Sequence, residues 1–101
     1  MSDLNNDLRL AIDTGKVSFG YRSLTRSING DTAKVVIIAA KGKREIIDDV
    51  MHACNIAGIR VIKFNGNSIE LGAACGKPHS VNGLAVLDAG NSNILNEKYE
   101  E

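Results

Sequence analysis

Two stretches of the chain carry apolar residues at the three- and four-residue spacing of an amphipathic helix. The first predicts a helix over about 3–14, which Gly15 ends. The second predicts a longer helix over 43–57, which Gly58 ends. In both stretches the polar residues fall on the opposite face, so each helix is expected to pack against another element.

Two shorter helices are predicted from local signals. One spans about 21–29 and follows a glycine that turns the chain. The other begins near Asn67 and is closed by Gly76. Its start is indicated by Asn67 and Glu70, which form the polar-x-x-Glu pattern of a capping box.

Apolar runs predict four strands, at 17–19, 35–40, 60–64 and 84–87. The run VVIIAA at 35–40 has no polar position, which favours a central strand covered on both faces. Strands that alternate with helices of this length predict an α/β fold, built as a three-layer α/β/α sandwich. We expect one domain over 1–101, because the chain contains neither a repeat nor a linker.

Composition agrees with a globular protein and excludes several other classes. Of the 101 residues, 44% are hydrophobic and 24% charged, and the mean hydropathy is -0.07. The longest apolar run is far shorter than the roughly 20 residues of a membrane span. Because the first residues are neither basic nor apolar, we predict no signal peptide and a cytosolic location. Cys54 and Cys75 are therefore expected to be reduced, buried thiols.

The net charge of zero conceals a segregation of charge along the chain. Between positions 16 and 80 there are ten Lys and Arg against five Asp and Glu, a surplus of five positive charges. The two ends carry the opposite surplus. This distribution is compatible with a basic binding face on a soluble protein, although sequence blocks are not surfaces.

Two loops after predicted strands concentrate this positive charge. In an α/β sheet, binding sites gather beyond the carboxyl ends of the strands. The first loop opens the second helix, where a glycine permits close approach of the backbone and helix N–H groups face an anion. Its candidate residues are Gly20, Tyr21, Arg22, Ser23 and, one turn further on, Arg26. A plain solvated helix face is an equally good interpretation of the two arginines.

The second loop places Lys41, Lys43 and Arg44 at the end of the central strand and the start of a helix. Cations disfavour a helix N-terminus, and such local conflicts tend to mark functional sites. A third candidate, the loop at 76–83, contains Lys77, His79 and Val81, the last expected to be an exposed apolar residue that contacts bases. This loop joins the same edge only if the last strand runs antiparallel to the others.

Three chemistries receive little support from the residues. The segment GAACGK at 72–77 has one residue too few for a phosphate-binding P-loop, and Pro78 follows its lysine. A zinc site is disfavoured because His52 and Cys54 lie about 200° apart on a helix. A Cys75–His79 nucleophile pair lacks an evident orienting group. We therefore expect no enzymatic activity, no metal and no cofactor.

The chain resembles the L30e family of archaeal and eukaryotic large-subunit ribosomal proteins, which belongs to the superfamily that binds kink-turn RNA. The resemblance covers about 8–95. It rests on segments in the family's order: DTGK at 13–16, FGYRS at 19–23, AKVVIIAA at 33–40, ELG at 70–72, GKPHSV at 76–81 and LDAGNSNIL at 87–95.

This resemblance implies a four-stranded mixed sheet and a non-enzymatic protein that holds ribosomal RNA at a kink-turn. It also implies other ribosomal proteins as neighbours, a location in cytoplasmic ribosomes and a monomer away from them. By the same resemblance, Gly20 lets the RNA approach, and Tyr21, Arg22 and Ser23 start the contacting helix. Lys41, Lys43, Arg44 and Lys77 are then expected to contact phosphates or bases, and His79 and Val81 to pack on bases.

The chain departs from related kink-turn proteins at four of these positions. Relatives often have an Asn-Glu pair where this chain has Tyr21 and Arg22, several have Asn at Lys41, and eukaryotic ones have an aromatic ring at His79. Two other functions stay open: a kink-turn protein of a non-ribosomal RNA particle, and a small-molecule-binding α/β domain or an enzyme that uses Cys75 and His79.

Overall fold

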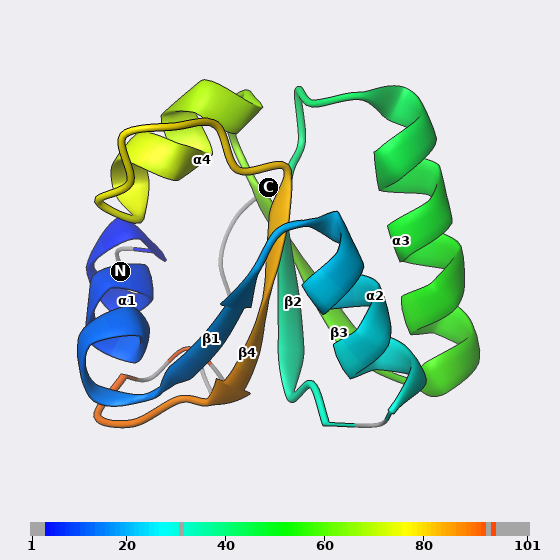
Figure 1. The fold of residues 1–101 in the computed structure, drawn as a ribbon, viewed down its shortest axis with the longest axis horizontal. Helices are drawn as coiled ribbons and strands as arrows, with labels where there is room; N and C mark the ends of the chain where they lie inside the picture. Colours follow the sequence, from blue (N-terminus) through cyan, green and yellow to red (C-terminus); the bar gives the residue numbers. More distant parts are fainter. Residues whose placement is uncertain (1–3, 31, 93, 95–101) are drawn as a thin grey trace.

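Helices and strands alternate along the chain in the predicted order. The computed structural model describes residues 4–30, 32–92 and 94, and most element bounds agree with the sequence prediction to within one or two residues. The elements are α1 (Leu4–Thr14), β1 (Lys16–Phe19), α2 (Tyr21–Asn29), β2 (Val35–Ala39), α3 (Arg44–Ala57), β3 (Arg60–Phe64), α4 (Ser68–Ala74) and β4 (Gly83–Asp88). Figure 1 shows them arranged as a sandwich, with the sheet between two pairs of helices.

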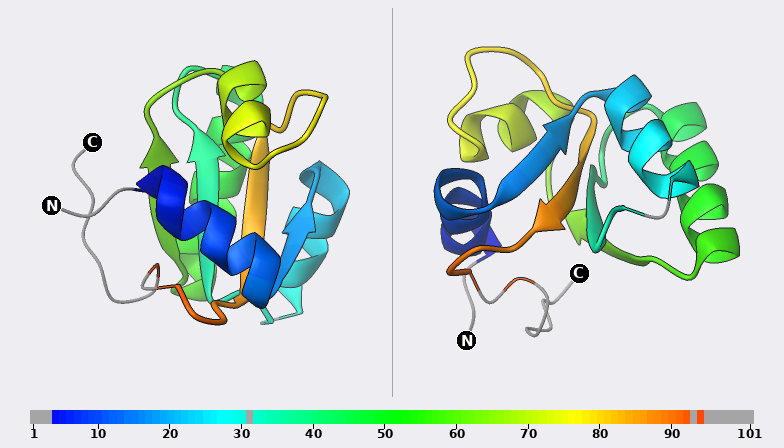
Figure 2. Two further views of the ribbon diagram at one scale, coloured as in Figure 1. Left: turned by 90° about the vertical axis from the view of Figure 1, so that its left-hand side faces the viewer. Right: turned by 60° about the horizontal axis from the view of Figure 1, so that its bottom comes forward.

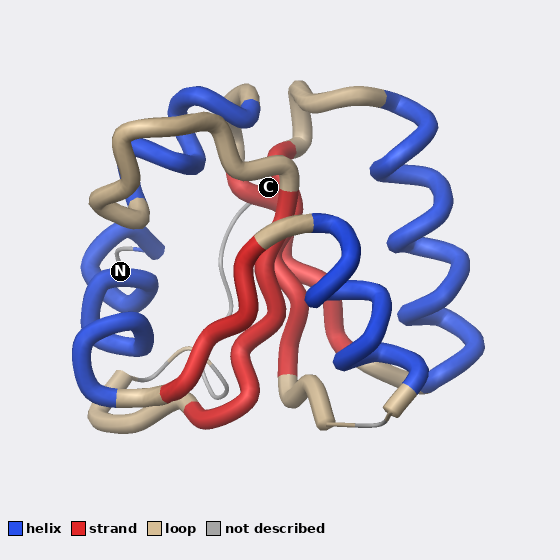
Figure 3. Tube along the Cα trace, in the orientation of Figure 1, coloured by secondary structure: helices blue, strands red, loops and turns tan. Residues whose placement is uncertain are grey.

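The four strands form one mixed sheet in the order β1-β4-β2-β3. β2 and β3 are parallel, whereas β4 is antiparallel to both of its neighbours, β1 and β2. The third loop was expected to join the other two only if the last strand ran antiparallel, and β4 does so. The carboxyl ends of β1, β2 and β3 and the start of β4 share one edge of the sheet, which we call the loop edge (Figure 3).

Each face of the sheet has its own hydrophobic core. Val35, Ile37 and Ala39 of β2 pack on the face covered by α1 and α4, and Val36 and Ile38 pack on the face covered by α2 and α3. All five side chains are fully buried, which confirms that β2 is covered on both faces. No helix within the described ranges is long and apolar enough to cross a membrane.

Local signals explain how two of the helices begin and end. The predicted capping box is present in α4: the Asn67 side chain accepts from the Glu70 amide (2.8 Å), and the Glu70 carboxylate accepts from the Asn67 amide (3.0 Å). Gly58 ends α3 in the left-handed conformation, with φ of 73°. Both elements are thus fixed by the residues that the sequence identifies.

Candidate nucleic-acid interface

The first loop brings an uncapped helix N-terminus to the loop edge. Gly20 precedes α2 with φ of 91°, and a Cβ atom added there would meet nothing within 4 Å. Glycine is therefore required by the backbone conformation and leaves the approach open. The N-cap residue Gly20 has no side chain to cap α2, so amide groups of its first turn are available to an anion beside the exposed Arg22 and Ser23.

The second loop holds its cations on a turn anchored by backbone hydrogen bonds. The Ala40 amide donates to the Phe64 carbonyl and the Lys41 amide donates to the Gly66 carbonyl, both at 2.9 Å. Lys41, Lys43 and Arg44 are exposed, and no side chain caps the N-terminus of α3. The three cations therefore surround a second uncapped helix start.

The third loop lies against α4. The Lys77 amide donates to the Gly72 carbonyl (2.8 Å), and the Val81 amide donates to the Ser68 carbonyl (2.9 Å). A Cβ atom on Gly72 would overlap the carbonyl group of His79, so the loop backbone packs directly on this glycine. The long segment between α4 and β4 is thereby held in one position.

Two contacts connect the loops with one another. The Lys77 ammonium lies 4.6 Å from the centroid of the Phe19 ring, which joins the third loop to the end of β1. The Ala39 amide donates to the Asn82 carbonyl (3.0 Å), which joins the third loop to the end of β2. The sequence analysis did not predict Phe19 or Asn82 as site residues, because each contact joins segments far apart in the chain.

Most of the predicted site residues have the required exposure, but the expectation of an exposed Val81 is wrong. Val81 is 3% exposed and belongs to the core between the sheet, α1 and α4. Its side chain points inward where the loop enters β4, so it positions the loop and does not contact bases in this conformation. His79 is exposed, and its Nδ1–H donates to the Ser80 carbonyl at 3.1 Å. Tyr21 begins α2, and its side chain lies outside the part that the structure describes.

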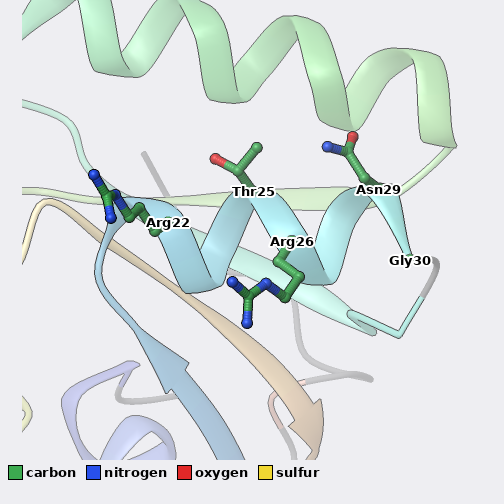
Figure 4. Close-up of a pocket in the computed structure, with 5 residues that line it drawn as sticks. All are labelled: Arg22, Thr25, Arg26, Asn29 and Gly30. Atoms are coloured by element: carbon green, nitrogen blue, oxygen red, sulfur yellow. The ribbon is translucent and has the colours of Figure 1, made fainter.

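The outer surface of α2 forms an open groove with a volume of about 600 Å³. It is lined by Arg22, Thr25, Arg26, Asn29 and Gly30. Figure 4 shows Thr25 and Asn29 on the side of the helix that faces α3, whereas Arg26 projects on the other side. The sequence analysis missed Thr25, Asn29 and Gly30, although their helical spacing from the two arginines was a usable signal.

The environment of Cys75 argues against thiol chemistry. Burial raises the pKa of the Cys75 thiol to about 11, although the nearby charges of Lys77 and Arg9 lower it. A nucleophile needs the thiolate, which this environment disfavours. Cys54 is also buried and its thiol pKa is raised by burial, while His52 is exposed on α3. Among the described residues, no group of three His, Cys, Asp or Glu could hold a metal ion.

The fold and this edge define a small α/β/α sandwich that presents cations from three separate loops. Residues 2–96 match the ribosomal protein L7Ae/L30e/S12e/Gadd45 family, and the chain belongs to that family. The family resemblance stated from the sequence is thereby confirmed.

Three curated relatives, all from archaea, align with this chain over nearly their whole length. The large ribosomal subunit protein eL30 of Pyrobaculum islandicum is 43% identical over 95 residues, which cover 94% of each chain. The eL30 protein of Methanobrevibacter smithii is 37% identical over 97 residues, covering 96% of this chain and 98% of the relative. The eL30 protein of Methanococcus maripaludis is 38% identical over 99 residues, covering 98% and 93% respectively.

Proposed function

We propose that this protein is a structural component of the large ribosomal subunit that binds ribosomal RNA at a kink-turn. The observation that carries the proposal is the meeting of three cationic loops, from distant parts of the chain, at one edge of the sheet. The names of the curated relatives favour the ribosomal setting over another RNA particle. Neighbouring ribosomal proteins are its other partners, the cytoplasmic ribosome is its location, and away from the ribosome it is a monomer.

Binding depends on complementarity to a bent backbone. A kink brings phosphates close together, and cations from several directions neutralise them more effectively than a single row of charge. Arg22, Lys41 and Lys77 supply these charges from three different loops, and the uncapped N-termini of α2 and α3 add amide donors. Because the bent RNA fits this edge better than straight duplex, binding shifts the RNA toward its bent state.

The role is architectural and not enzymatic. Membership of a ribosomal protein family supports it, and so does the protonated state in which burial holds the Cys75 thiol. His79 then serves as an exposed ring for packing on a base, where its imidazole face can contact an unstacked nucleotide.

Equilibrium binding to two RNAs tests the proposal. One RNA contains a kink-turn, and the other is the same sequence with its internal loop closed into plain duplex. We expect tight binding to the kinked RNA and weak, strongly salt-dependent binding to the duplex. Equal affinity for the two RNAs at every salt concentration would show nonspecific electrostatic binding, and no binding to either would remove the proposed function.

Two single variants test whether the RNA binds at the loop edge. Arg22→Ala is expected to weaken binding to the kinked RNA by about 1–3 kcal/mol if Arg22 makes a specific contact. Lys34→Ala is the matched control, because Lys34 is exposed at the start of β2, on the opposite edge of the sheet. Equal effects of the two substitutions would place the RNA elsewhere.

A further inference from the structure

The sequence analysis counted Arg9 with the acidic ends of the chain, but the fold places it beside the third loop. Arg9 is an exposed residue of α1, and α1 packs next to α4. The left view in Figure 2 shows α1 in front, with α4 and the loop that follows it above. A positive charge from the first helix thus adjoins a loop that lies almost seventy positions further along the chain.

The Arg9 guanidinium faces the space that a side chain on Gly76 would occupy. Its Cζ and Nη1 atoms are 3.3 Å, and its Nη2 atom is 3.6 Å, from the position that a Cβ atom on Gly76 would occupy. Similar distances to three atoms of one plane indicate that the plane faces the glycine. Gly76 has φ of 75°, a conformation that favours a residue without a side chain, and so leaves room for the guanidinium.

Arg9 and Lys77 form a pair of cations around the start of the third loop. The Arg9 guanidinium lies beside Gly76, the residue that directly precedes Lys77 in the chain. The Lys77 ammonium is engaged by the Phe19 ring. Within residues 4–30, 32–92 and 94, neither cation has a carboxylate partner. Like charges that lie near each other repel, and a bound anion offsets this repulsion.

A purely structural role for Arg9 at the end of α4 is poorly supported. Three carbonyl groups in the last turn of α4 already have backbone donors: the Cys75 amide donates to Leu71, the Gly76 amide to Ala73 and the Lys77 amide to Gly72. The guanidinium is therefore not needed to satisfy them. The N–H groups of the exposed Arg9 side chain stay available for an external acceptor.

We propose that Arg9 and Lys77 form a second phosphate-binding patch, which extends the RNA interface from the loop edge onto the α1–α4 side of the molecule. The inference rests on the proposed function and adds to it the contact with a flanking segment of the same RNA. A guanidinium presents paired donors that match the oxygens of a phosphodiester, and the position of Arg9 beside Gly76 places those donors next to Lys77. An acidic protein segment is the alternative occupant, and the test separates the two.

The test measures RNA affinity over a salt series for Arg9→Ala and Arg9→Gln, the second of which keeps a long side chain over Gly76. Each variant is expected to bind kinked RNA roughly 3- to 10-fold more weakly near 0.1 M salt. The slope of log K against log salt should become less steep by about 0.7–0.9, the change for one lost phosphate contact. Thermal unfolding should stay unchanged. Lys16→Ala is the control: it removes an exposed cation at the opposite edge of the sheet and should alter neither affinity nor slope.

Two results would overturn the inference. If the Arg9 variants keep their RNA affinity and salt slope, the patch does not bind RNA, and an acidic protein segment becomes its occupant. If they have a lower melting temperature and an unchanged slope, Arg9 has a structural role. Failure of the proposed function has a different result: the unsubstituted protein would then bind kinked RNA no more tightly than duplex. The slope change on either RNA still reports whether Arg9 contacts a phosphate.

Discussion

The ammonium of Lys77 lies 4.6 Å from the centre of the Phe19 ring, so the loop before β4 is fastened to the end of β1. These two strands are antiparallel neighbours, and Phe19 is paired with Leu84 in their register. The contact therefore joins the loop before β4 to the same strand with which β4 pairs. It also fixes the position of a cation that the sequence identifies only as one of several in a basic segment.

Substitutions of Phe19 test the contribution of this cation–π contact. Phe19→Leu keeps an apolar side chain but removes the electron-rich face, and it should lower the free energy of unfolding by at least about 0.5–1 kcal/mol, with a parallel loss of RNA affinity. Phe19→Tyr keeps the face and should behave like the original protein. Urea unfolding and RNA titration measure both effects, and identical behaviour of the two variants would contradict a role for the ring.

Val81 and His79 lie two positions apart in the third loop and should respond in opposite ways. Val81→Ala removes buried methyl groups and is expected to lower the free energy of unfolding by about 1.5–3 kcal/mol, with little change in RNA affinity at temperatures where it stays folded. His79→Ala should change stability by less than about 0.5 kcal/mol. It should weaken RNA binding by about 1–3 kcal/mol if the ring packs on a base. A reversed pattern would show that Val81 faces the RNA.

Close packing at Gly72 predicts a variant that affects both stability and binding. In Gly72→Ala the new methyl group would collide with the His79 carbonyl, and the third loop must move. We expect a loss of at least about 2–3 kcal/mol in the free energy of unfolding, together with weaker RNA binding. Thermal denaturation and RNA titration test this.

Gly58→Ala is the matched control for that variant. Gly58 has φ of 73° and open space around it, so alanine there should cost only about 1–2 kcal/mol of backbone strain. It lies at the far end of α3, away from the loop edge, and should not change RNA affinity. If both alanines weakened RNA binding equally, the position of Gly72 under the loop would be irrelevant to binding.

Stability should fall in alkaline solution because of Cys75. Burial raises the pKa of its thiol from 9.0 to about 11, so between these pH values the folded state binds more protons than the unfolded state. The stabilisation is complete below pH 9 and is lost as pH rises toward 11, by up to about 2–3 kcal/mol. Denaturant unfolding at several pH values measures it. Cys75→Ala should show a shallower decline over this range, and equal declines would contradict the assignment.

Periodicity and local motifs were sufficient to predict most of the fold. The uninterrupted apolar run of β2 indicated two covered faces, and the pair Asn67 and Glu70 indicated the start of α4. The direction of β4 could not be predicted, because strand direction depends on pairing between distant segments. The sequence analysis therefore left both directions open.

The same reason explains what the sequence did not show at the site. Side chains in a loop follow no period, so the inward direction of Val81 could not be distinguished from an outward one. The positions of Arg9 beside Gly76 and of Lys77 on Phe19 arise from tertiary contacts between separate segments. Charge counted along the chain thus placed Arg9 in an acidic region, whereas the fold places it in a basic one.

The most direct measurement of the central claim is the end-to-end distance of a kink-turn RNA that carries a donor and an acceptor dye on its two arms. In buffer without magnesium, where the free RNA is extended, addition of the protein should raise energy transfer to the value of the tightly bent form. The control duplex should not respond. Binding that leaves energy transfer unchanged would contradict the proposal that this protein holds RNA in a bent state.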